Sequence, residues 1–225
     1  NRNLPFDAGK INAGVLSHAH LDHSGALPTL VKGGFSGKIY CTKETAEIAK
    51  FILLDSANIQ EYDAQYLNKH LKKGEEEILP IYTKEDVERT LEHFEAVDYF
   101  SVSQKWINLA PGMRFKFYEA GHILGSASVL LEAKEDGKIK TLAFTGDLGR
   151  QSAPILKSPE AIKEKTDWLI SECTYGNRVH QSMHEVGNKL ASIIYNAIAK
   201  GGKIVIPAFS LGRTQEIVYI LHKLA

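Results

Sequence analysis

The chain has 225 residues, of which 44% are hydrophobic and 24% are charged, an ordinary composition for a globular protein. Lysine plus arginine equals aspartate plus glutamate at 27 each, so composition gives no support for a nucleic-acid partner, although a neutral protein can carry a basic cleft. Apolar runs fall short of the ~18 residues of a membrane helix, and the start NRNLPFDAG does not resemble a signal peptide. The widely separated Cys41 and Cys173 predict free, buried thiols in a reducing cytoplasm.

Strands and helices alternate through the first hundred residues. The expected elements are a strand at 11–17, a helix at 24–31, a strand at 38–41, a long helix from Thr42 and a second helix from Thr83. The long helix is amphipathic, with apolar residues at Ile48, Ile52, Leu53 and Ile59. Thr83 and Asp86 have the spacing of a capping box, and Phe94 is expected on the apolar face of this second helix.

After residue 97 the pattern changes to short strands separated by Gly-containing turns. Strands are expected at 106–109, 114–120, 127–133, 139–146 and 166–172. An amphipathic helix then begins at a second capping box, Ser182 with Glu185, and ends at Gly201. A buried strand at 202–209 and a helix from Arg213 to Ala225 complete the prediction.

The segment SHAHLDHSG places three histidines and an aspartate within six positions, directly after the first expected strand. Such a cluster has no structural use in a globular core unless a cation holds it together. Imidazole and carboxylate ligands suit zinc, with iron or manganese as alternatives. His18 and His20 can share one side of an extended turn, while Asp22 and His23 begin the next helix, so one loop could serve two ions.

Two later loops can complete this site. His122 lies in AGHILGSAS and Asp147 in FTGDLGR, each in a Gly-flanked loop after a strand. Taken alone, either residue would be read as an ordinary structural or turn residue; the HAHLDH segment raises the case for both. The remaining histidines stand singly and are interpreted mostly as solvent-facing, namely His70, His93, His180, His184 and His222.

The order H-x-H-x-D-H, then G-H, then G-D resembles the metallo-β-lactamase superfamily. The segments SHAHLDHSGALPTL, TGDLGR, SECTYGNR and IPAFSLGRTQE narrow the resemblance to the β-CASP branch of RNA-processing nucleases. The resemblance implies that His18, His20 and His122 bind a first zinc ion, that Asp22 and His23 bind a second, and that Asp147 bridges both. It also implies that Glu172 is an outer partner of a catalytic histidine; an ordinary carboxylate at a strand end is the alternative.

The same resemblance implies a fold and a domain division. The fold is α/β: an αββα sandwich, incomplete at both ends, followed by the start of an α/β β-CASP cap domain. Residues 1–172 would form the catalytic domain and 173–225 the first part of the second domain. Members of this family have further residues before and after the matching segment, so we expect this chain to lack the last zinc ligand of the second site and the histidine that protonates the leaving group. The 225 residues by themselves are therefore expected to be poorly active.

The implied function is zinc-dependent hydrolysis of RNA phosphodiester bonds, with Asp22, Asp147 and Glu172 in the catalytic machinery and a hydroxide held between two Zn²⁺ ions. Single-stranded RNA is the expected substrate, with cytoplasmic location, no membrane contact and a homodimer as one candidate assembly. Two alternatives stay open: another hydrolase of this fold, such as a thioesterase, lactonase or β-lactamase, and a non-catalytic scaffold of an RNA-processing complex. The sequence does not distinguish endonuclease from exonuclease activity.

Overall fold

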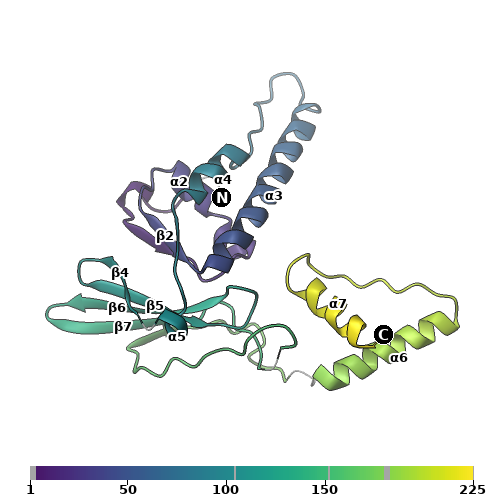
Figure 1. The fold of residues 1–225 in the computed structure, drawn as a ribbon. Coiled ribbons are helices and arrows are strands. Elements are labelled where there is room, and N and C mark those ends of the chain that lie inside the picture. Colours follow the sequence, from purple (N-terminus) through teal and green to yellow (C-terminus); the bar gives the residue numbers. More distant parts are fainter. Residues whose placement is uncertain (1–3, 104, 152, 180–182, 225) are drawn as a thin grey trace.

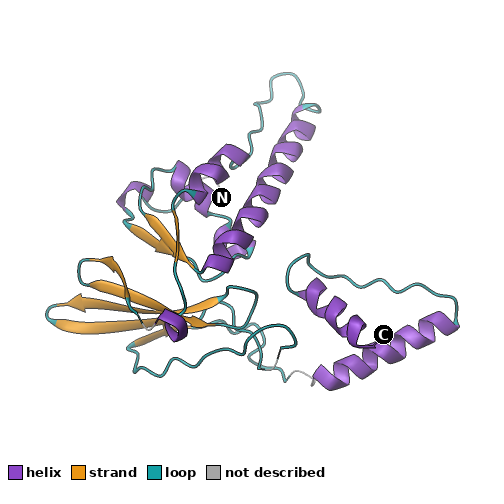
Figure 2. Ribbon diagram, viewed as in Figure 1, coloured by secondary structure: helices purple, strands orange, loops and turns teal. Residues whose placement is uncertain are grey.

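A computed structural model describes residues 4–103, 105–151, 153–179 and 183–224 (Figures 1 and 2). The first half contains a short 3₁₀ helix, three strands and five helices, with bounds η1 Ala8–Lys10, β1 Ala13–Val15, α1 Leu21–Ser24, α2 Leu27–Lys32, β2 Lys38–Cys41, α3 Lys43–Asn68, α4 Lys84–Leu91, β3 Phe94–Ala96 and α5 Phe100–Ser103. The second half contains β4 Ile107–Ala110, β5 Met113–Glu119, β6 Ala127–Glu135, β7 Lys138–Phe144, β8 Trp168–Ile170, α6 Met183–Ala199 and α7 Arg213–Leu224.

The first sheet is parallel and has the order β1-β2-β3. Its register pairs Val15 with Tyr40 and Cys41 with Ala96, so all three strands end at the same edge. Helices α3 and α4 cover it and bury an apolar cluster that includes Leu53 and Val87. This edge is where the loop with the HAHLDH segment emerges.

The second sheet has the order β4-β5-β6-β7-β8 and is antiparallel except for the β7–β8 pair. Hairpin pairing between β5 and β6 extends from Met113–Ala133 to Glu119–Ala127. Its inner face buries Phe115 and Phe117, and Val15 and Tyr40 of the first sheet pack against this cluster. The two sheets therefore face each other across a shared apolar layer, as the predicted sandwich requires.

Local sequence signals account for the helix starts. Thr42 is the N-cap of α3 and accepts a hydrogen bond from the amide of Thr45. The predicted capping box of α4 is present, because Thr83 and Asp86 each accept the other's amide hydrogen. Leu53 lies in the buried stripe of α3 as expected, whereas Ile59 is 52% exposed.

Three further expectations about the fold are wrong. Phe94 belongs to β3 and not to the face of α4, because α4 ends at Leu91 and the following residues pair with β2. The segment 202–209 is not a buried strand: no described strand pairs with it, and Val205 is 89% exposed. Cys41 is buried, but Cys173 is exposed. The capping residue Ser182 lies outside the described residues, as does Ala225.

Helices α6 and α7 pack against each other beside the two sheets (Figure 1). The segment that precedes α7 contacts the sandwich, because Leu211 packs against the cluster of α3 and α4. No helix of the described residues is both long enough and apolar enough to span a membrane.

A buried lysine supports the outer face of the second sheet. The side chain of Lys116, 3% exposed, forms an ion pair with Glu164 and lies 3.7 Å from the centre of the Phe100 ring and 4.5 Å from that of Trp106. The Tyr118 hydroxyl donates to the same carboxylate at 2.6–2.7 Å. Burial alone would raise the pKa of Glu164, but the hydrogen bonds from Lys116 and Tyr118 outweigh it and lower that pKa.

Removing the carboxylate should therefore destabilise the fold more than removing the ammonium. Glu164→Ala leaves a buried charge without its partner, which costs about 3–5 kcal/mol for a fully buried pair; because Glu164 is about one-third exposed, we expect about 2 kcal/mol. Lys116→Met keeps the apolar stem and should change the free energy of unfolding by less than about 1 kcal/mol. Urea unfolding of both variants measures the difference, and an equal loss in each would contradict this account.

Candidate metal centre

The HAHLDH segment lies beyond the carboxyl end of β1. His18 is buried, and its Nδ1 lies 3.2 Å from the Ser17 hydroxyl. His20 follows in extended conformation as the N-cap position of α1, so Asp22 and His23 occupy the single turn of that helix. The Ser24 hydroxyl donates to the carbonyls of Ala19 and His20 and fixes the turn. One nine-residue stretch thus presents four candidate ligands.

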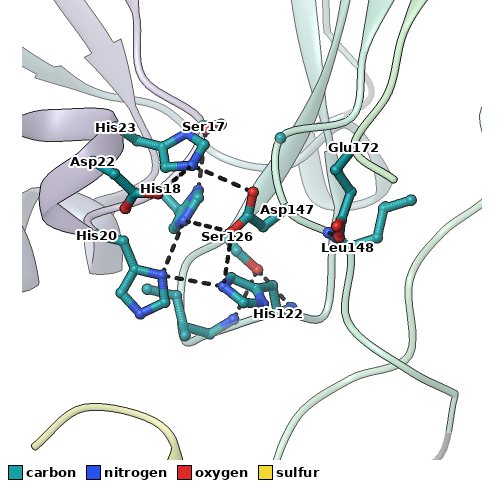
Figure 3. Close-up of polar contacts among 12 residues, drawn as sticks. Ser17, His18, His20, Asp22, His23, His122, Ser126, Asp147, Leu148 and Glu172 are labelled. Atoms are coloured by element: carbon teal, nitrogen blue, oxygen red, sulfur yellow. Dashed lines mark hydrogen bonds and ion pairs between the residues drawn. The ribbon is translucent and has the colours of Figure 1, made fainter. Parts of the chain in front are cut away.

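The loop that carries His122 joins β5 to β6. Gly121 adopts φ = 64°, which favours glycine, and Ser126 braces the loop by accepting hydrogen bonds from the amides of His122 (2.9 Å) and Ile123 (3.2 Å). The ring of His122 is directed toward His20 (Figure 3). The loop therefore supplies a ligand from the second sheet to the cluster on the first.

Asp147 follows β7, in a loop that touches the His122 loop through its backbone. Gly149 donates its amide hydrogen to the carbonyl of Ala120 at 2.8 Å. A Cβ at Gly149 would lie 1.7 Å from the carbonyl oxygen of Gly121, so only glycine permits this approach. Glu172, after β8, accepts the Leu148 amide hydrogen at 2.7 Å and holds the loop from its other side (Figure 3).

Four of the predicted ligands form one group: His18, His20, His122 and Asp147. The Nδ1 of His20 lies 3.1 Å from the Nε2 atoms of both His18 and His122. Asp147 Oδ2 lies 3.4 Å from His122 Nε2 and 3.8 Å from His18 Nε2. Tetrahedral ligands about 2.05 Å from a zinc ion are about 3.3 Å apart, so these separations suit a shared ion.

Hydrogen bonding alone does not explain the close approach of three rings. A ring nitrogen carries either one lone pair or one hydrogen in its plane, so His20 Nδ1 cannot serve two imidazole partners well. A cation placed between the ring nitrogens of His18, His20 and His122 would use one lone pair from each ring. The donor set therefore fits a divalent metal ion.

A second group shares Asp147 with the first and adds Asp22 and His23. His23 Nε2 lies 3.3 Å from Asp147 Oδ1 and 3.4 Å from Asp22 Oδ2. Asp147 thus directs one carboxylate oxygen to each group, the arrangement of a bridging ligand (Figure 3). All six predicted ligands come together, four from the first half of the chain and two from loops of the second sheet.

Electrostatics keep the buried rings neutral. Burial and then the nearby charges of His23, His122 and His20 lower the pKa of His18 to about 2. Burial, followed by the charge of His122, lowers the pKa of His20, and burial also lowers that of His122 although Asp147 opposes it. A neutral imidazole has a free lone pair at neutral pH, which is the form that binds metal.

The metal-free fold should consequently lose stability in mild acid. The folded pKa of His18 lies below its unfolded value of about 6.5, so the unfolded chain binds more protons below that pH, and stability falls as pH decreases. His18 alone should remove about 1.4 kcal/mol between pH 7.5 and 5.5. Urea unfolding in a chelator at both pH values measures this difference. His18→Asn should reduce the dependence, with the remainder due to His20 and His122, while the exposed His70→Gln should keep it in full. A pH-independent wild type would contradict the expectation.

Glu172 is placed to position the loop that carries Asp147. Its carboxylate accepts from Leu148 and, at 3.3 Å, from the amide of Thr174. Burial would raise its pKa, but these amides and the charge of His122 lower it. Glu172 thus holds the Asp147 loop; its predicted partnership with a catalytic histidine stays a prediction. His180 lies outside the described residues, and so does the side chain of His184.

The residues that support the ligands were not evident from the sequence. Besides Ser17, Ser126 and Gly149, these include the paired threonines at the start of α3: both Thr42 and Thr45 donate hydroxyl hydrogens to the carbonyl of Gly125. The Thr-x-x-Thr spacing and the glycines on either side of His122 were visible, but nothing in the sequence indicated that they meet. His93, expected to face solvent, is half-buried and contacts the carbonyl of Gly37 at 2.8 Å.

Comparison with known proteins identifies the family of the chain. Residues 7–145 match the family model of the metallo-beta-lactamase superfamily domain. The chain is 32% identical to a ribonuclease of Thermus thermophilus, over 96% of this chain and 44% of that protein. It is 33% identical to a transcription termination factor of Methanothermobacter thermautotrophicus (98% and 32%) and 33% identical to cleavage and polyadenylation specificity factor 73 of Drosophila melanogaster (98% and 30%).

The chain spans less than half the length of these relatives. The similarity to these relatives extends over almost all of the present chain, from the HAHLDH segment to the C-terminal helices. It confirms the predicted resemblance to the β-CASP branch of RNA-processing nucleases. The matched residues include the four ligands of the first half and His122. The chain therefore belongs to the metallo-β-lactamase superfamily.

Proposed function

We propose that this chain carries the catalytic centre of a zinc-dependent ribonuclease that hydrolyses phosphodiester bonds of single-stranded RNA. The observation that supports this most is the pair of donor groups joined through the two oxygens of Asp147. Relatives whose names include ribonuclease support the substrate class. Two divalent ions bound there would supply an activated water and would neutralise charge on the phosphate.

The residues of the chain have distinct parts in this proposal. His18, His20 and His122 would hold one ion through neutral ring nitrogens, and Asp22 and His23 would hold the other. Asp147 would fix the spacing between the two, and Glu172 would keep the Asp147 loop in place through Leu148. We also propose that residues 1–172 form the catalytic domain and that 173–225 begin a second domain, since α6 and α7 pack on each other beside the sheets.

The two groups should differ in affinity. The His18 group offers four donor residues and the Asp22 group offers three, one of them shared. A zinc site with fewer protein ligands is the weaker one, so the first equivalent of Zn²⁺ should bind more tightly than the second. Calorimetric titration of the chelator-treated chain measures both steps, and His20→Ala should weaken the first step selectively. Two equal, tight equivalents would show that a further residue completes the second group.

The substrate class is tested by parallel assays on the full-length protein loaded with Zn²⁺. Single-stranded RNA should be cleaved, whereas a thioester, a lactone and a β-lactam should be turned over slowly or not at all. Efficient turnover of one of these small substrates without RNA cleavage would favour another hydrolase of this fold. RNA binding without any turnover would favour a scaffold. Chelator treatment is the control, because it should abolish RNA cleavage and Zn²⁺ should restore it.

A further inference from the structure

The loop 121–126 is a rigid unit that is anchored to α3 at one point. Within the loop, Ser126 accepts two amide hydrogens and donates its own amide hydrogen to the carbonyl of Ile123 at 3.0 Å. At the outer end of the loop, the carbonyl of Gly125 accepts two hydroxyl hydrogens, from Thr42 at 2.7 Å and Thr45 at 2.8 Å. Because the loop is internally braced, a shift of Gly125 would move His122 with it.

Both threonines are fully buried, at 1% and 0% exposure. A Cβ on Gly125 would lie 2.6 Å from the backbone nitrogen of Thr45, so the loop lies directly on the first turn of α3. Thr42 also caps that helix, whereas the hydroxyl of Thr45 has only the Gly125 carbonyl as a hydrogen-bond partner among the described residues. No side-chain atom of either residue belongs to the two donor groups.

The two hydrogen bonds to Gly125 connect the His122 loop to the segment that carries the other ligands, because α3 begins next to that segment. Thr42 follows β2 directly, and β2 pairs with β1, whose carboxyl end leads to Ser17 and His18. A second tie lies directly after the loop, where the amide of Ala127 donates to the carbonyl of Ser17 at 2.8 Å. The His122 loop is thus tied, on the C-terminal side of His122, to two points that directly follow strands of the first sheet.

We infer that Thr45, together with Thr42, is a positioning residue that sets the distance of His122 from His18 and His20. This role rests on the proposed metal centre. Metal ligands must be placed to within about 0.5 Å, and removal of a hydrogen bond that orients a ligand usually weakens metal binding by about 10–100-fold. The two hydroxyl hydrogen bonds provide such a constraint across the seam between the two sheets.

The test uses Thr45→Val, which keeps the shape and removes the hydroxyl, and Thr45→Ser, which keeps the hydroxyl. Thr90→Val is the matched control, because the hydroxyl of Thr90 is equally buried and donates to the carbonyl of Asp86 within α4. Binding of Co²⁺ to the chelator-treated chain, followed by its visible absorption, reports affinity and ligand geometry. Urea unfolding of each metal-free variant reports stability separately.

Thr45→Val should weaken Co²⁺ binding by about 10–100-fold and alter the absorption, while Thr45→Ser should stay within about threefold of wild type. Thr90→Val should lose stability and keep wild-type binding. Thr45→Ala removes the same hydroxyl and serves if the valine variant does not fold. Unchanged Co²⁺ affinity and spectrum in the folded valine or alanine variant would overturn the inference. A wild-type chain that binds no Co²⁺ would instead overturn the metal centre itself, and the inference with it.

Discussion

Asp147→Asn should lower hydrolysis of RNA by the zinc-loaded full-length protein about a thousandfold, the largest loss expected from a single substitution. The two carboxylate oxygens of Asp147 face different donor groups, His23 on one side and His122 on the other. An amide has nearly the same shape but no charge, and its nitrogen is not a ligand for a cation, so one side of the bridge is lost. Loss of a single electrostatic contribution in an active site commonly reduces the rate by about 10²–10³-fold.

In Asp147→Asn, the zinc content should fall together with the activity, and the protein should stay folded. The Asp147 side chain is about one-third exposed, so the free energy of unfolding of the metal-free chain should change by less than about 1 kcal/mol. Asp98→Asn, at an exposed position outside both donor groups, is the control for loss of one carboxylate. An asparagine variant that retains two zinc equivalents and near-normal cleavage would exclude the bridging role.

Gly149→Ala should disrupt the centre without changing any ligand. The added Cβ would lie 1.7 Å from the carbonyl oxygen of Gly121 and 2.8 Å from the amide nitrogen of His122. Relief of that overlap requires the two loops to separate by more than 1 Å, which exceeds the tolerance of a metal site of about 0.5 Å. We expect Zn²⁺ affinity to fall by at least about 10-fold and the free energy of unfolding to fall by about 2 kcal/mol.

Gly187→Ala provides the matched comparison. Gly187 lies within α6, and a Cβ there would have no neighbour within 4 Å. Alanine is the better helix former by about 1 kcal/mol, so this variant should be as stable as wild type or slightly more stable, with unchanged Zn²⁺ binding. Isothermal titration and urea unfolding of both variants measure these effects. Wild-type Zn²⁺ affinity in Gly149→Ala would show that the backbone contact does not position Asp147.

The residue types at the metal centre were visible in the sequence because the chemistry of metal binding restricts them severely. Three histidines and an aspartate within six positions have few uses other than holding a cation, and that cluster drew attention to His122 and Asp147. Local signals were equally informative where a single element decided the outcome. The Thr83–Asp86 capping box and the start of α3 at Thr42 depend on neighbouring residues alone.

Where an outcome depends on partners distant in sequence, the sequence was less informative. Phe94 fits the apolar period of α4, but strand pairing with β2 places it in β3. The segment 202–209 has the composition of a buried strand, yet a strand needs a neighbour for its backbone groups, and no described strand pairs with it. Cys173 was expected to be buried on composition, whereas its position after β8 leaves it exposed.

The sequence by itself determined which side chains could bind a cation, and it determined the family through the order of those side chains along the chain. Only the tertiary structure decided how they meet. His122 and Asp147 reach the HAHLDH cluster because Gly149 lets their two loops touch and because two threonine hydroxyls anchor the His122 loop to α3. The physical reason is that ligand identity is a property of single residues, whereas ligand distance depends on hydrogen bonds to backbone groups of segments about thirty to eighty residues apart.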